Sequence, residues 1–193
     1  MKTAVPKKRN PVAGVVRRAL REMEPHQRGT IAEPALINLA IQDHLLGKLN
    51  LEKKQLEKAK QISAHTYRLQ QATTAIANEA PITVRMAKDI ISKTLESIPG
   101  FLERNERMLP VAEVQHLAEL QKNLSSDLNK MSKWDPNHHT SLTQEFLSTA
   151  AEITFNELCS VLGDKKFDEY LANQRRAQRF LANAAGKGLI GQK

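Results

Sequence analysis

Two copies of the pentapeptide Arg-Arg-Ala-x-Arg, at residues 17–21 and 175–179, are the most suggestive chemical feature of the sequence. At about 100° per residue, the arginines of each copy fall within one third of a helix circumference, opposite apolar residues. A planar guanidinium can bind two phosphate oxygens at once, so such faces suit a nucleic-acid backbone. The alternative is an ordinary solvated surface, because charged side chains collect on exposed helix faces. The predicted phosphate contacts, including basic residues near the N-terminus, are Lys7, Lys8, Arg9, Arg17, Arg18, Arg21, Arg175, Arg176 and Arg179.

No arrangement of residues predicts catalysis. Glu113 and His116 have the E-x-x-H spacing of di-iron helical bundles, but such a bundle needs a second copy and the sequence has none. His138 and His139 are adjacent in a polar segment with Trp134, which offers too few ligands for a zinc site. Phosphate-binding glycine loops and nucleophile elbows are missing. We therefore predict a non-enzymatic protein with no catalytic residue, metal or cofactor. The alternative, metal chemistry at Glu113 and His116, would show as bound metal in an elemental analysis.

The charge of the sequence is basic and unevenly distributed. Lys and Arg number 29 against 21 Asp and Glu, which gives a net charge of +8. Residues 1–30 carry eight basic and two acidic side chains, and residues 165–193 carry seven and two. This balance predicts an acidic partner, with nucleic acid, and DNA in particular, as the first candidate. An acidic protein surface is the alternative.

The protein-binding alternative rests on the stretch 141–164, which carries four acidic side chains and no basic one. This stretch could face a basic end of a neighbouring copy, and we expect a homo-oligomer. The protein would then be a scaffold, a capsid-associated protein or an inhibitor that docks on an acidic partner. A steep salt dependence of nucleic-acid binding would favour the first hypothesis over this one.

The sequence predicts a cytoplasmic protein without a membrane partner. No apolar run approaches the ~18 residues that a membrane-spanning helix needs. The single cysteine, Cys159, excludes an intramolecular disulfide and suits a reducing compartment.

Composition and periodicity predict an all-α fold of about seven helices in an elongated bundle. Aromatic residues make up only 4% of the chain, and Gly and Pro number eight each, which favours helices over sheets. We expect Asn50 to cap one long helix, Pro99-Gly100 to interrupt the next, and Ser141 to cap a later one. The expected organisation is a flexible basic arm and helix over residues 1–30, a bundle over 31–185 and a flexible tail over 186–193.

The long helix carries a heptad-like seam, in which Ile62, Leu69 and Ile76 recur every seven residues. The small residues Ala59, Thr66 and Thr73 lie three positions earlier, which allows close approach of another helix.

Residues 51–109 resemble the central part of the small terminase subunits of tailed phages. In that family a charged helix precedes a polar break and a shorter helix that ends in Leu-x-x-(Ile/Leu)-Pro. Here the segments are LEKKQLEKAK, NEAPIT and Leu95-Glu-Ser-Ile98-Pro99-Gly-Phe-Leu102, and the match covers under a third of the chain. The resemblance implies a ring-forming DNA-packaging protein that delivers genome ends to a separate ATPase and nuclease. The long helix would then mediate oligomerisation, the arginine faces would touch DNA, and the chain would hold no catalytic residue.

Overall fold

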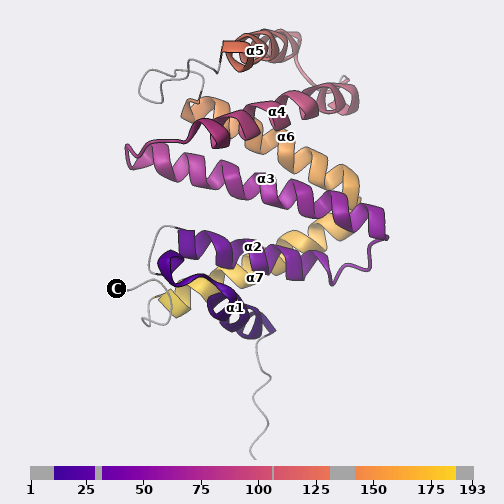
Figure 1. Cartoon of the computed structure of the whole chain (residues 1–193). Coiled ribbons are helices and arrows are strands. Elements are labelled where there is room, and N and C mark those ends of the chain that lie inside the picture. Colours follow the sequence, from indigo (N-terminus) through magenta and orange to yellow (C-terminus); the bar gives the residue numbers. More distant parts are fainter. Residues whose placement is uncertain (1–10, 29–31, 106, 131–141, 186–193) are drawn as a thin grey trace, which may run out of the picture. The chain divides into compact units, whose positions relative to one another are not determined.

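The computed structural model describes residues 11–28, 32–105, 107–130 and 142–185. Within these ranges the chain forms seven α-helices, one short 3-10 helix and no strand, so the all-α prediction is confirmed (Figure 1). The predicted basic arm and the predicted tail lie outside the described residues. No described helix combines the length and the apolar character needed to cross a membrane. The helices are α1 (Pro11–Glu22), η1 (Pro25–Gln27), α2 (Ala32–Leu46), α3 (Lys53–Ala77), α4 (Val84–Asn105), α5 (Val111–Lys130), α6 (Gln144–Leu162) and α7 (Asp164–Ala185).

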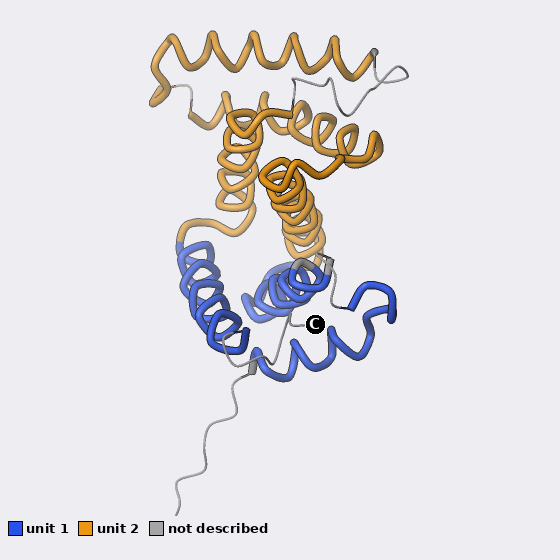
Figure 2. The backbone as a smooth tube through the Cα atoms, turned by 90° about the vertical axis from the view of Figure 1, so that its left-hand side faces the viewer, with its two compact units in different colours: residues 1–52, 165–193 blue, residues 53–164 orange. Residues whose placement is uncertain are grey.

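The chain divides into two compact units (Figure 2). Unit 1 comprises residues 1–52 and 165–193, and therefore contains α1, α2 and α7. Unit 2 comprises residues 53–164 and contains α3 to α6. This division differs from the predicted one, which set the first helix apart from a single bundle over 31–185. The reason is a long-range contact, because the last helix joins the first two in one core.

Unit 1 is held together by a small apolar core to which all three helices contribute. Val12 and Val16 of α1 pack with Ile37 and Ile41 of α2 and with Ala177 of α7. The amide of Gln178 donates a hydrogen bond to Asn38 Oδ1 at 3.0 Å, which adds a polar link between α7 and α2. Burial of apolar surface is the main stabilising term in such a core, and it needs no help from disulfides or metals to join three helices.

Unit 2 buries the predicted seam of the long helix. α3 packs against α6 and α4, and Ala59, Ile62 and Leu69 are buried in the unit. The hydroxyls of Thr66 and Thr73 donate hydrogen bonds to the carbonyl oxygens four residues earlier. Their hydrogen-bond donors are therefore used within α3 itself. The buried part of the seam therefore serves the interior of unit 2, while Thr66 and Ile76 are half-buried and Thr73 is exposed.

Pro99 lies inside α4, and the predicted interruption at Pro99-Gly100 is wrong. Proline inside a helix removes a backbone hydrogen bond and costs about 3 kcal/mol. On either side of it, Ile98 and Phe101 are buried, and each contributes roughly 1.5–3 kcal/mol. Burial of these two side chains offsets the local cost, while Pro99 itself is exposed.

Two predicted helix caps also differ from the structure. α3 begins at Lys53, and Asn50 instead adopts a positive φ of 50° in the preceding turn. The cap of α6 is Thr143, whose side chain accepts a hydrogen bond from the backbone N–H of Phe146 at 3.1 Å. Side chains of the preferred capping type stood at several neighbouring positions, and only the backbone path selects which of them caps.

Glycines at two positions make opposite contributions to stability. Gly14 lies within α1 and a methyl group there would meet nothing within 4 Å. Gly163 ends α6 with φ 72° and ψ 153°, a conformation that is almost restricted to glycine. Its N–H donates to the carbonyl oxygen of Cys159 at 2.8 Å and closes the helix.

We expect Gly14→Ala to stabilise the protein by about 0.5–1 kcal/mol, because alanine loses less backbone entropy in a helix. Gly163→Ala should destabilise it by about 1–3 kcal/mol, because a Cβ is strained in that conformation. Urea denaturation followed by circular dichroism measures both changes. Equal effects of the two substitutions would contradict this assignment.

Candidate functional site

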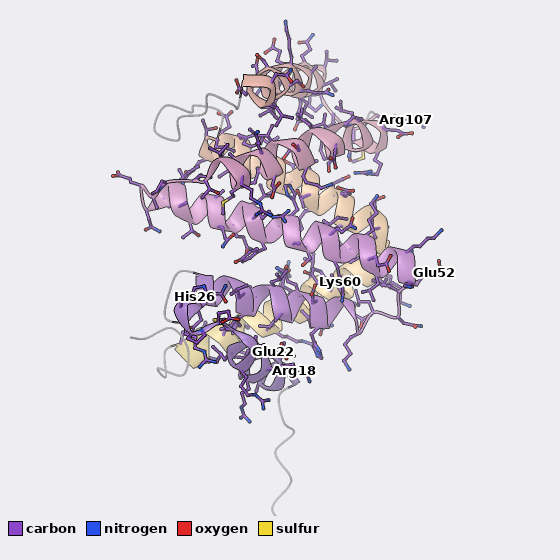
Figure 3. All side chains as sticks on the ribbon, viewed as in Figure 1. Arg18, Glu22, His26, Glu52, Lys60 and Arg107 are labelled. Atoms are coloured by element: carbon purple, nitrogen blue, oxygen red, sulfur yellow. The ribbon has the colours of Figure 1, made fainter. Side chains whose placement is uncertain are left out.

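The first arginine cluster lies on the exposed side of α1. The buried face of α1 holds Val12, Val16 and Met23, and the opposite, exposed face holds Arg17, Arg18 and Arg21. Helical periodicity predicts these two faces. Figure 3 marks Arg18 on this helix.

The second arginine cluster lies on the exposed side of α7. Arg175, Arg176 and Arg179 are exposed, and Ala177 between them is 0% exposed. The alanine of the pentapeptide therefore has a structural role, because a methyl side chain allows close packing of α7 in the core of unit 1. Tyr170 of the same helix is also buried. Its burial and the nearby charge of Asp43 raise the pKa of its hydroxyl.

The two clusters belong to one compact unit although they are more than 150 residues apart in the sequence. Unit 1 contains 16 Lys and Arg against 7 Asp and Glu, a net charge of +9. Unit 2 contains 13 against 14, a net charge of −1. The whole basic excess of the protein is therefore carried by the unit that presents both arginine clusters.

Among the described residues, no ion pair engages a guanidinium group of these clusters. In the described ranges, ion pairs join Lys58 to Glu157, Arg68 to Asp89 and Lys93 to Glu96, and none includes an arginine of either cluster. Arg21 Nε donates a hydrogen bond to the carbonyl oxygen of Arg17, at 3.4 Å, which links two residues of the first cluster. The donors of the clusters are therefore available to an external anion.

A further basic residue, Lys48, lies in the turn that follows α2. Burial lowers the pKa of His44, and the neighbouring positive charges of Lys48 and Arg18 lower it further. These two cations thus act on one point between α1 and the end of α2. Sequence periodicity did not identify Lys48, because it lies outside any helix.

The other predicted or considered positions do not form a site in the described structure. Lys7, Lys8 and Arg9 lie outside the described residues, as do His138 and His139. Glu113 and His116 are both exposed on α5. In the part of the chain that the structure describes, no three His, Cys, Asp or Glu side chains are placed to hold a metal ion.

The sequence analysis missed a buried histidine in unit 2. His65, on α3, is only 4% exposed, and neither of its ring nitrogens has a hydrogen-bond partner among the described residues. It borders a cavity of about 240 Å³ between α3, α4 and α6. A signal was present in the sequence, since His65 lies three residues after Ile62 and four before Leu69, beside the seam of the long helix.

The environment of His65 keeps its ring neutral at neutral pH. Burial lowers its pKa from 6.5 to about 4, and the positive charges of Arg68 and Lys93 act in the same direction. The carboxylates of Glu157 and Asp89 raise the pKa but do not compensate. A neutral imidazole has one N–H donor and one acceptor nitrogen, and both nitrogens are buried without a hydrogen-bond partner among the described residues.

Comparison of the chain with protein-family models, with curated proteins and with solved structures finds no match. The resemblance to small terminase subunits therefore stays a prediction from the sequence, and function has to be argued from the two features described above.

We expect the protein to lose stability as the pH falls from about 6.5 towards 4, because the unfolded chain then binds a proton that folded His65 does not. This pKa difference corresponds to about 2 kcal/mol between pH 7.5 and pH 5. Urea denaturation of the wild type and of His65→Leu at both pH values measures it, and the variant should lack this part of the pH dependence. As a control, His116→Gln should keep it, since that side chain is exposed on α5. An identical pH dependence in wild type and His65→Leu would contradict the assignment.

Proposed function

We propose that the protein is a non-enzymatic nucleic-acid-binding assembly protein that contacts duplex DNA through the arginine clusters of unit 1. The observation that carries this proposal is the concentration of the basic excess in unit 1, together with the exposed guanidinium groups of α1 and α7, which form no ion pair with any described residue. A regular array of phosphates is the partner that such a surface fits best, because each guanidinium can bind two oxygens of one phosphate.

Contact with a duplex backbone is preferred over stacking on single-stranded bases. Stacking needs exposed aromatic rings beside the basic groups. The aromatic residue next to the second cluster, Phe180, packs against the apolar core of unit 1. Phe167 is half-buried and Tyr170 is buried, so the described part of unit 1 offers no exposed Phe, Tyr or Trp ring. Binding would therefore depend on phosphate charge rather than on base sequence.

Nucleic acid is also preferred over an acidic protein or a second copy of the chain. The acidic stretch 141–164 is the predicted contact for a basic end of a neighbouring copy, and it contains the whole of α6, which packs against α3 and α4 within unit 2. Glu157 is already bound by Lys58 Nζ at 3.4 Å and by the hydroxyl of Ser97 at 2.8 Å. One of its four carboxylates is thus satisfied inside its own unit, which weakens the case for a mating surface.

The terminase resemblance extends the proposal to genome packaging. Under that extension the DNA would be viral and several copies would assemble, with chemistry left to a separate enzyme. The buried seam of α3 argues that assembly would use a surface other than that seam.

We expect the triple substitution Arg175→Gln, Arg176→Gln and Arg179→Gln to weaken binding of a duplex DNA fragment by more than about tenfold at 0.1 M salt. The loss of one neutralised phosphate already weakens binding by about this factor, and the substitution removes three guanidinium groups. The slope of log affinity against log salt should become shallower by about 0.9 for each lost contact. Fluorescence anisotropy at several salt concentrations measures both quantities. The corresponding substitutions at Arg17, Arg18 and Arg21 should act in the same direction.

The matched control removes the same charge from unit 2 through Arg85→Gln, Lys88→Gln and Lys122→Gln, all at exposed positions. It should leave DNA affinity nearly unchanged. Equal losses in the control and the α7 variant would mean that net charge alone matters. If the wild-type protein shows no measurable binding to DNA at low salt, the nucleic-acid proposal fails and an acidic protein becomes the partner to test.

A further inference from the structure

We propose that unit 2 contains a binding site for a small polar molecule of zero net charge, in the cavity that His65 borders between α3, α4 and α6. The site lies in a different unit from the arginine clusters, and the proposal does not depend on DNA binding.

The first argument is the absence of partners for a buried imidazole. Almost all buried polar groups in proteins have a hydrogen-bond partner, and a buried group without one destabilises the fold. His65 leaves both Nδ1 and Nε2 without a described partner at 4% exposure. An apolar side chain of similar size would fill this position in the seam at a lower cost. Both nitrogens have almost no accessible surface, so the ring has to turn towards the cavity before a ligand there can bind one nitrogen as acceptor and the other as donor.

The second argument is the polarity of the groups that line the same cavity. Ser97 Oγ donates its proton to Glu157 Oε2 at 2.8 Å, and Thr154 Oγ1 donates to the carbonyl oxygen of Ala150 at 2.6 Å. Both hydroxyl protons are used, so the oxygen lone pairs of Ser97 and Thr154 remain as acceptors. The ammonium groups of Lys58 and Lys93 provide donors at the edge of the cavity. A ligand in this space would meet donors and acceptors on several sides.

The third argument is the charge balance of the cavity. Two ammonium groups, Lys58 and Lys93, lie beside two carboxylates, Glu157 and Glu96, and they form the ion pairs Lys58–Glu157 and Lys93–Glu96. With a neutral imidazole the lining has no net charge. A simple anion or cation meets as many like as opposite charges there and gains no net attraction, whereas a zwitterion or an uncharged polar molecule can bind lining groups of both signs.

The fourth argument is size. The cavity measures about 240 Å³, below the 300–1,000 Å³ usual for drug-sized ligands. A liquid water molecule takes about 30 Å³, so the space suits a molecule the size of a small amino acid, a polyol or an amide. Isolated water molecules filling the same space are the competing explanation, and the experiment separates the two.

The test uses the full chain with ¹⁵N-labelled histidine. Long-range ¹⁵N–¹H spectra report both ring nitrogens of His65, assigned by their loss in His65→Leu. Four groups of fragments are titrated: zwitterionic amino acids, uncharged polyols and amides, carboxylates with phosphate, and alkylamines. We expect saturable shifts of the His65 signals with at least one member of the first two groups, and none with the last two.

A surface substitution tests the charge argument without endangering the fold. Lys58→Gln, at a side chain that is 57% exposed, leaves the lining with one excess negative charge and should weaken the active fragment by about fivefold, the effect of one lost hydrogen bond. The control Lys122→Gln, exposed on α5 and away from this cavity, should not change the affinity.

Three results would overturn the proposal. Shifts caused by phosphate, carboxylates or alkylamines instead would exclude a neutral ligand. The absence of shifts with every group would leave only water in the cavity. Shifts that persist in His65→Leu, followed at backbone amides, would place the binding elsewhere. DNA binding by unit 1 is measured in a separate experiment, so failure of either proposal leaves the other unaffected.

Discussion

The burial of Ala177 against the apolar faces of α1 and α2 is the contact on which the basic surface of unit 1 depends. A helix can direct only one side towards a core, so burying this residue turns its neighbours Arg175, Arg176 and Arg179 towards solvent. Val16 places the α1 arginines in the same way. A larger side chain in place of Ala177 would separate α7 from the core and would displace the arginines with it.

The same contact determines where the charge of the protein is concentrated. Residues 165–193 bring seven basic side chains into the unit formed by the N-terminal part of the chain, and unit 1 reaches a net charge of +9. Concentrated like charge destabilises a compact unit through self-repulsion. An anionic partner would relieve that repulsion, which gives the proposed DNA contact a thermodynamic as well as a geometric basis.

Unit 2 follows a different electrostatic pattern, because its charges are nearly balanced and several are paired within the unit. Its stability rests on the seam of α3 buried against α4 and α6. His65 interrupts that seam at a free-energy cost, and the unit tolerates it because Ile62 and Leu69 on either side are buried. A bound molecule would remove this cost, because it would supply the hydrogen-bond partners that the imidazole lacks.

The sequence by itself determined the helices and their faces. Apolar residues at helical spacing predicted seven helices, and the same periodicity placed six arginines on exposed sides, because both properties depend only on residues within a few turns. Local signals failed where a distant contact outweighed them. Pro99 stays helical because Ile98 and Phe101 are buried, and Thr143 caps α6 because of the path the backbone takes. Only the tertiary structure decided that α7 joins α1 and α2, and that the nitrogens of His65 have no hydrogen-bond partner among the described residues. Both depend on which helices meet across long stretches of chain, and no local periodicity encodes such a meeting.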